Sequence, residues 1–177
     1  MTKRSRILFV GDSITHGTDW SKRIYFAEVN NIAVPGYSTD DVLVQLPEIV
    51  EIEPQIISLL IGTNDFGNVL LDRAGEEVGQ RVNTIIQEIT AALPKVKLVV
   101  NSILPRGLEF TTRIDTANRI ISKYFSDQVI HLDIWPTLSK DKFLNPKYLL
   151  EDGFDVHLNE DGYDAWAGQL IPVLKSL

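Results

Sequence analysis

The alternation of short apolar runs with amphipathic stretches constrains the fold of this chain more than any other feature. Five runs have the composition of buried strands, at residues 7–10, 32–34, 56–61, 98–103 and 129–134. Stretches with helical spacing lie between or after them, most clearly at residues 78–93. Strands that alternate with helices form parallel sheets joined by right-handed crossovers. We therefore expect an α/β three-layer sandwich, with a flavodoxin-like five-stranded parallel sheet of order 2-1-3-4-5 and helices on both faces.

Single residues in the helical stretches give more local expectations. Ser38 or Thr39 can cap the helix that begins near residue 40, and Asn159 can cap the last helix. Pro47 predicts a kink or a break in the first of these helices, because proline removes a backbone hydrogen bond. The connection between the first two strands is brief, so we expect a short or irregular helix there.

Length and charge limit the classes of protein to which the chain can belong. Its 177 residues predict one domain, residues 1–177. The net charge of −7 argues against a nucleic-acid-binding protein, because phosphate binding needs concentrated basic charge. The chain has no cysteine, and its apolar stretches are too short for a signal peptide or a membrane span. We expect a soluble, cytoplasmic protein, either a monomer or a homo-oligomer.

Four residues with useful chemistry follow the predicted strands. Ser13, in the segment Gly-Asp-Ser-Ile-Thr, comes after the first strand, and Gly36 comes after the second. Asn64 follows the third strand, and His157 lies in the loop after the fifth. The carboxyl ends of parallel strands share one edge of the sheet, which is where ligands bind. We therefore expect these four residues to converge.

Together these residue types suit acyl transfer. A serine hydroxyl becomes a good nucleophile only when a neighbouring base removes its proton, and histidine titrates in the right range for that role. The oxyanion that forms needs fixed hydrogen-bond donors. Gly36 offers an unobstructed backbone N–H, and Asn64 offers a side-chain amide.

The same segments resemble the four sequence blocks of the SGNH hydrolase superfamily, the GDSL-type esterases and lipases. Residues 11–15 are similar to the nucleophile block, and residues 31–36 resemble the second block. Residues 61–66, Ile-Gly-Thr-Asn-Asp-Phe, are similar to the third block, and residues 157–163, His-Leu-Asn-Glu-Asp-Gly-Tyr, resemble the fourth. Their order and approximate spacing also agree, over almost the whole chain.

The resemblance implies a carboxylic ester hydrolase that works through an acyl-enzyme, with no metal and no organic cofactor. Ser13 is then the nucleophile, and its backbone N–H is one oxyanion donor. Gly36 and Asn64 are the other donors, and His157 is the base. The implied partner is a small-molecule ester, and we expect a short acyl group, above all O-acetyl, on a carbohydrate.

Members of this family usually have a third catalytic residue, an acid that orients the histidine and completes a catalytic triad. At this residue the chain departs from the family pattern. The family acid usually stands three residues before the histidine, and here that position is Phe154. Asp155 stands two residues before His157, and Asp152 stands five before it. We favour Asp155 narrowly over Asp152. A backbone carbonyl is a third way to orient the imidazole, leaving a Ser-His dyad.

Several neighbouring side chains have a structural interpretation. We expect Asp12 to fix the nucleophile turn and His131 to be a hydrogen-bonded structural residue. We expect Asp65 to give structural support, with a bond across to the nucleophile loop as one way to do so. Arg106 has two interpretations, a substrate contact and a solvated loop arginine, and we favour the second. Five aromatic residues are candidates for the pocket, of which we expect one or two to line it: Trp20, Tyr25, Phe66, Trp135 and Phe154.

Two other functions fit parts of the sequence. The hydroxyl-rich loop at residues 13–18 resembles the phosphate-binding loop of a flavodoxin-type module for flavin mononucleotide. That function gives no reason for the third and fourth blocks. A catalytically silent family member that binds acylated sugars is the second alternative, because the triad acid is displaced.

Overall fold

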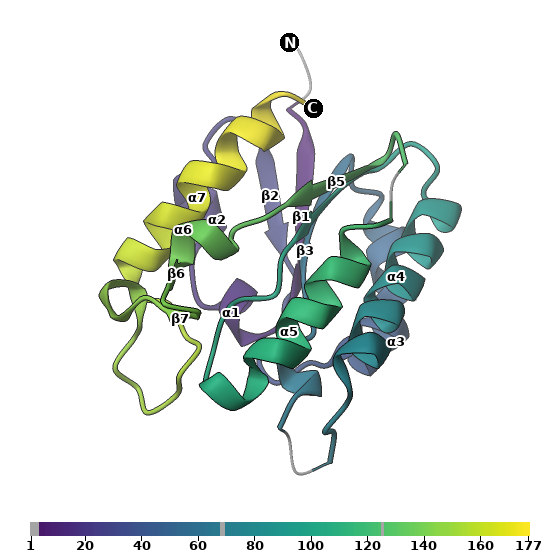
Figure 1. Cartoon of the computed structure of the whole chain (residues 1–177). Coiled ribbons are helices and arrows are strands. Elements are labelled where there is room, and N and C mark those ends of the chain that lie inside the picture. Colours follow the sequence, from purple (N-terminus) through teal and green to yellow (C-terminus); the bar gives the residue numbers. More distant parts are fainter. Residues whose placement is uncertain (1–3, 68–69, 125) are drawn as a thin grey trace.

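The computed structural model describes residues 4–67, 70–124 and 126–177. Its centre is a parallel sheet in the order β2-β1-β3-β4-β5 (Figure 1). The strands of this sheet are β1 (Arg6–Gly11), β2 (Glu28–Asn31), β3 (Ile56–Leu60), β4 (Lys97–Asn101) and β5 (Val129–Leu132). The predicted fold class and strand order are confirmed.

Helices occupy most of the connections between these strands. The longer helices are α3 (Thr39–Ile52), α4 (Gly75–Ala92), α5 (Leu108–Ile121) and α7 (Glu160–Lys175). Single turns form α1 (Ser13–His16), α2 (Trp20–Arg23), α6 (Trp135–Leu138) and the 3-10 helices η1 (Thr63–Asp65) and η2 (Pro146–Tyr148). A small antiparallel hairpin pairs β6 (Ser139–Lys140) with β7 (Phe143–Leu144). The connection after β1 holds only α1 and α2, which agrees with the short helix expected there.

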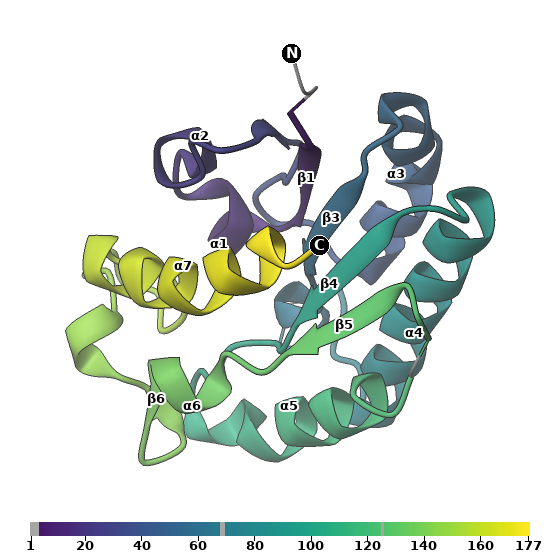
Figure 2. The ribbon, with the colours of Figure 1, turned by 90° about the horizontal axis from the view of Figure 1, so that it is seen from above.

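The sheet carries a hydrophobic core on each face. Alternate residues of a strand point to opposite faces, so Leu8 packs with α3, α4 and α5, while Phe9 packs with α2 and α7. Figure 2 shows these two helical layers on either side of the sheet. On the second face, the ring of Trp20 stacks on Phe9 at 4.4 Å and meets Trp166 edge-on at 4.7 Å. This aromatic cluster fixes α7, and therefore the loop before it, against β1.

The second strand lies earlier than predicted. We expected it at residues 32–34, but β2 covers Glu28–Asn31. Three of the four residues of this edge strand are exposed, so they carry no apolar pattern that a sequence reading can detect. The predicted segment still runs beside β1, because Ile32 N–H donates to Phe9 O at 3.1 Å.

The helix caps agree with the sequence, but the predicted break does not. Ser38 precedes α3, and the carboxylate of Asp41 accepts from the backbone N–H of Ser38 at 2.8 Å. Asn159 caps α7 by accepting from Gly162 N–H at 3.0 Å. α3 continues through Pro47 to Ile52, so the break predicted there is wrong. The helix loses one internal donor at Pro47 and is held by its buried face.

The carboxyl end of β1 leads into α1, in the lower half of the molecule in Figure 1, and the loop before α7 lies on the same side. The described helices include none that is both long and apolar enough to cross a bilayer.

Candidate active site

The nucleophile candidate stands at the carboxyl end of β1. Gly11 has no room for a side chain, since a Cβ there would lie 2.3 Å from the carbonyl oxygen of Leu60. Asp12 then caps α1, because its carboxylate accepts from the backbone N–H of Ile14 at 2.9 Å. Ser13 is therefore the first residue of α1, at the sheet edge. The turn-fixing contact expected of Asp12 is present.

His157 reaches Ser13 from the other end of the chain. Its Nε2 lies 3.0 Å from Ser13 Oγ, although the two residues are 144 positions apart. The loop before α7 is closed by an antiparallel bridge between Leu149 and Leu158. In the same loop, Leu150 N–H donates to the carbonyl oxygen of His157 at 2.9 Å. This pairing fixes the backbone that carries the imidazole.

The carboxylate behind the imidazole belongs to Asp152, which corrects the expectation that favoured Asp155. Asp152 Oδ2 lies 2.5 Å from His157 Nδ1, and Asp152 Oδ1 accepts from Phe154 N–H at 3.0 Å. The chain turns back at Gly153, whose φ of +89° is a conformation that favours glycine. This turn lets a carboxylate five positions before the histidine reach its ring. The hydrogen bond with His157 holds the pKa of Asp152 below its ordinary value.

Asp155 has a different partner. Its Oδ2 accepts from the backbone N–H of Gly107 at 2.7 Å, and its Oδ1 lies 3.4 Å from the guanidinium of Arg106. Both oxygens thus face the loop after β4 rather than the imidazole. Asp155 ties the loop that carries Asp152 and His157 to the loop after β4.

The two other oxyanion candidates lie on the loops after β2 and β3. Gly36 has a φ of +85°, which residues with side chains rarely adopt, although the space around it is open. Asn64 lies in η1, and its Nδ2 donates to the carbonyl oxygen of Tyr37 at 2.9 Å. This bond uses one of the two amide protons, so the other remains for a ligand oxygen. It also connects the loop of Asn64 to the loop of Gly36.

A buried ion pair holds η1 in place. Asp65 is fully buried and accepts from the backbone N–H and the hydroxyl of Thr39 at 3.0 Å and 2.6 Å. Arg73 Nη1 lies 2.5 Å from the same carboxylate. These bonds fasten η1, which carries Asn64, to the start of α3. Asp65 thus gives structural support, but its carboxylate bonds to Thr39 and Arg73 rather than to the nucleophile loop.

One cavity of about 340 Å³ brings the candidate residues together. Its lining comprises Ser13, Gly36, Thr63, Asn64, Phe66, Gly67, Arg106, Phe154, Val156 and His157. Two of the five aromatic candidates, Phe66 and Phe154, thus reach it. Arg106 was expected in solvent, but it lines the cavity and donates to Thr63 O at 3.2 Å. Its position after the carboxyl end of β4 is the signal that could have identified it.

Burial under the nucleophile turn affects the charge of Asp12. Loss of hydration raises the pKa of Asp12 to about 7, and the nearby Asp65 acts in the same direction, while the N–H of Ile14 opposes them. Its Oδ2 has no hydrogen-bond partner among the described residues. Near neutral pH this carboxyl is therefore partly protonated, which limits negative charge beside Ser13.

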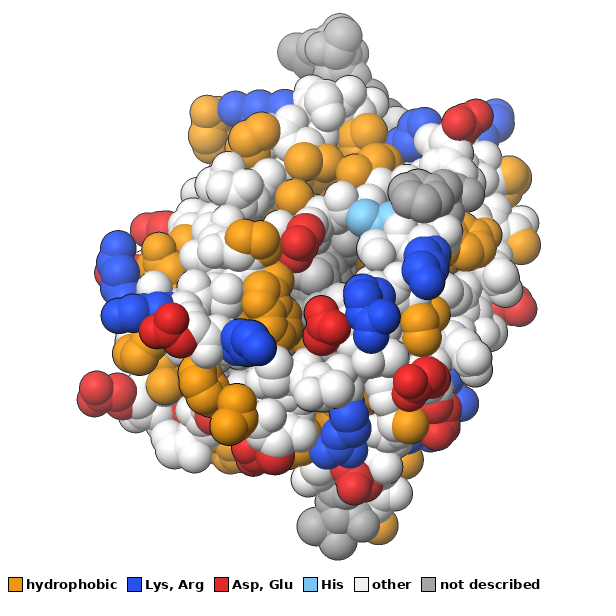
Figure 3. All heavy atoms as spheres, viewed as in Figure 1, with side chains coloured by type: hydrophobic (Ala, Val, Ile, Leu, Met, Phe, Trp, Pro, Cys, Tyr) orange, Lys and Arg blue, Asp and Glu red, His pale blue; other side chains and the backbone are white. Residues whose placement is uncertain are grey.

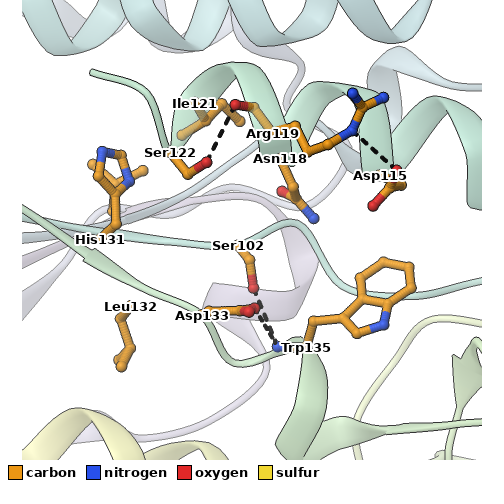
Figure 4. Close-up of a pocket in the computed structure, with 11 residues that line it drawn as sticks. Ser102, Asp115, Asn118, Arg119, Ile121, Ser122, His131, Leu132, Asp133 and Trp135 are labelled. Atoms are coloured by element: carbon orange, nitrogen blue, oxygen red, sulfur yellow. Dashed lines mark hydrogen bonds and ion pairs between the residues drawn. The ribbon is translucent and has the colours of Figure 1, made fainter. Parts of the chain in front are cut away.

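A second cavity, of about 240 Å³, lies between α5 and β5 (Figure 4). Its polar side chains mainly support the backbone: the amide of Asn118 bonds both the N–H and the carbonyl of Ile103, at 2.8 Å and 3.0 Å. His131 Nε2 lies 2.7 Å from the carbonyl oxygen of Tyr124, which agrees with its expected structural role. Because these polar side chains support the backbone, the cavity between α5 and β5 is the weaker candidate for chemistry.

The face of the molecule in Figure 3, which is hollowed near its middle, mixes acidic and basic side chains.

The fold and the side chains at its carboxyl edge are characteristic of ester hydrolases built on an open α/β sheet. A hydroxyl, an imidazole and a carboxylate form one chain of hydrogen bonds beside two further donors. The chain belongs to the GDSL-like lipase/acylhydrolase family, whose model matches residues 9–165. This family membership leaves the flavodoxin-type alternative without support.

Curated proteins with a similar sequence include the alpha2 subunit of platelet-activating factor acetylhydrolase IB from chicken, Gallus gallus. It is 32% identical over 111 residues, which are 59% of this chain and 46% of that protein. The human alpha1 subunit is 29% identical over the same length. The match thus spans about half the length of these relatives.

Solved structures show the same fold. A GDSL-like lipase from Bacteroides thetaiotaomicron superposes with a TM-score of 0.82, covering 97% of this chain and 88% of that one, at 19% identity. A carbohydrate esterase of family 3 from Talaromyces cellulolyticus superposes with a TM-score of 0.77 over 97% of both chains, also at 19% identity. At these identities the likeness concerns the fold alone.

Proposed function

We propose that the protein is a serine esterase that hydrolyses short-acyl esters, above all O-acetyl esters of carbohydrates, through an acyl-enzyme on Ser13. The observation that carries the proposal is the hydrogen-bond chain from Ser13 Oγ through His157 to Asp152. Its nucleophilic end opens into the cavity that Gly36 and Asn64 also line.

In the first half-reaction, Ser13 Oγ attacks the ester carbonyl carbon while His157 Nε2 takes the hydroxyl proton. The carbonyl oxygen becomes an oxyanion that accepts from the N–H groups of Ser13 and Gly36 and from Asn64 Nδ2. The bond to the leaving oxygen then breaks, and that oxygen takes the proton from His157. Asp152 holds the imidazole in the tautomer with a proton on Nδ1 and stabilises its charged form.

The second half-reaction releases the acid. Water loses a proton to His157 Nε2 and attacks the acyl carbon, and the oxyanion is held by the same donors. When the carbon–Oγ bond breaks, Ser13 Oγ takes the proton back. No step needs a metal or an organic cofactor.

A short acyl group suits the cavity, because its volume of about 340 Å³ is small for a ligand site and its lining includes the buried Thr63 and Val156. The names of the relatives point the same way, since the chicken and human proteins are acetylhydrolase subunits. A panel of p-nitrophenyl esters from acetyl to octanoyl tests this part. We expect kcat/KM to fall beyond butyryl, and a steady rise through octanoyl would contradict it.

The nucleophile is tested with Ser13→Ala and with a fluorophosphonate probe. We expect Ser13→Ala to lose acetyl-ester turnover and probe labelling while its melting temperature stays close to that of the parent protein. Ser21→Ala, a change at an exposed position of helix α2, is the matched control and retains both. A parent protein that shows neither labelling nor turnover would be a catalytically silent member of the family.

A further inference from the structure

Phe154 is an exposed aromatic ring at the mouth of the catalytic cavity. Its side chain belongs to neither hydrophobic core, and the residue is 63% exposed. Yet it lines the cavity together with Ser13, and its ring centroid lies 5.1 Å from that of His157. A large apolar ring that gains nothing from core burial suits contact with a ligand.

The backbone under this ring is held on both sides. The N–H of Phe154 donates to Asp152 Oδ1, so the carboxylate that orients His157 also positions the aromatic residue. On the other side, Asp155 accepts from Gly107 N–H at 2.7 Å. The turn thus presents Phe154 in a defined place relative to the imidazole.

The position of the ring shows which part of an ester it would meet. Ser13 N–H, Gly36 and Asn64 hold the carbonyl oxygen in the proposed mechanism, and the leaving oxygen must lie within reach of His157. His157 gives its proton to the leaving oxygen, so the alcohol part departs past the imidazole. Phe154 stands beside that imidazole, on the alcohol side.

We propose that Phe154 is a specificity-determining residue, which packs its ring against a pyranose ring of the leaving alcohol. The inference rests on the proposed esterase function and names the alcohol that the site selects. A pyranose has a flat C–H face, which suits an aromatic ring, and hydroxyl groups around its edge, which need polar partners. Phe154 supplies the flat apolar face, and Arg106, which lines the same cavity, supplies a polar partner. A simple alkyl alcohol would use neither.

The test compares two acetyl esters that differ only in the alcohol: a mono-O-acetylated methyl xyloside and ethyl acetate. The measured quantity is the ratio of their kcat/KM values. We expect the parent protein to favour the xyloside, and Phe154→Ala to lower the ratio about tenfold, mainly by raising KM for the xyloside. Phe154→Tyr should keep the ratio, and Phe154→Leu should lower it, because leucine is apolar but not flat.

Two controls separate selectivity from damage to the site. Tyr25→Ala removes an aromatic residue that is 73% exposed and lies outside the cavity lining, and it should leave the ratio unchanged. Every variant keeps the backbone N–H of residue 154, so the pH profile of kcat should keep its shape.

Either of two results would overturn the proposal. They are an unchanged ratio in Phe154→Ala, with or without an equal loss for both esters, and a parent protein that prefers ethyl acetate to the xyloside. Failure of the proposed esterase function looks different, because the parent protein would then hydrolyse neither ester and Ser13 would not label.

Discussion

Asp152 uses each of its carboxylate oxygens for a separate contact, one with the imidazole of His157 and one with the N–H of Phe154. We expect Asp152→Asn to lower kcat for acetyl esters by about 10²–10⁴-fold, because an amide no longer stabilises the charged imidazole or fixes its tautomer. Steady-state kinetics with p-nitrophenyl acetate measure the loss.

Asp155→Asn is the matched control for this change. It removes the charge that faces Arg106 but can keep an oxygen for Gly107 N–H, so we expect less than about a tenfold loss. A larger loss in Asp155→Asn than in Asp152→Asn would contradict the assignment of the triad acid.

The second residue-scale prediction concerns Asp12 and pH. Its pKa is raised from 3.8 to about 7 by burial, so the folded protein binds this proton more tightly than the unfolded chain does. The stability contributed by the proton is fully present at low pH and is lost as the pH rises between about 4 and 7. We therefore expect Asp12→Asn, which stays neutral, to gain melting temperature over the parent protein at pH 8. The gain should shrink towards zero near pH 4 in thermal unfolding, and an equal difference at both pH values would contradict it.

The sequence alone was enough to predict that Ser13, Gly36, Asn64 and His157 converge, because each follows a recognisable strand or block. It was not enough for the acid, since the sequence favoured Asp155 over Asp152 only narrowly and did not reveal the turn at Gly153. In the structure that glycine has a positive φ, Asp152 contacts His157, and Asp155 contacts Gly107.

At the scale of elements, the site depends on the ion pair that joins η1 to α3. Asp65 is fully buried, and Arg73 is the cation that faces it. We expect Arg73→Met to lower the free energy of unfolding by about 3–5 kcal/mol, because it leaves an uncompensated buried charge. The kcat/KM for acetyl esters should fall with it, because η1 carries Asn64. Chemical denaturation and steady-state kinetics provide the two measurements.

The double variant Asp65→Asn, Arg73→Met is the control for this prediction. It removes the buried charge together with its partner, so it should be more stable than Arg73→Met alone. If the double variant were the less stable of the two, the ion pair would not be what holds η1.

Secondary structure was predictable where a face is buried and unpredictable where it is not. β3 and α4 were located from their apolar patterns, since their buried residues recur at strand and helix spacing. β2 is mostly exposed, so its side chains do not show the apolar pattern from which a strand paired with β1 could be predicted. The break expected at Pro47 failed because the buried face of α3 outweighs one lost hydrogen bond.

At the scale of the whole molecule, both hydrophobic cores share one sheet. Leu8 and Phe9 are consecutive residues of β1 but belong to opposite cores, so neither core can open without disturbing the strand that both use. We therefore expect a single cooperative unfolding transition, as one domain of residues 1–177 requires. Calorimetric and van't Hoff enthalpies should agree, and a calorimetric value well above the van't Hoff value would indicate separate units.

The distance along the chain between Ser13 and His157 has a consequence for synthesis. Synthesis proceeds from Ser13 towards His157, so the nucleophile is made 144 residues before the base. A nascent chain therefore carries an unactivated hydroxyl until α7 can dock, and truncated products lack the base altogether. For the same reason, the chain offers a natural split reporter: a cut in a surface loop between the two residues would make ester hydrolysis depend on reassembly of the fragments.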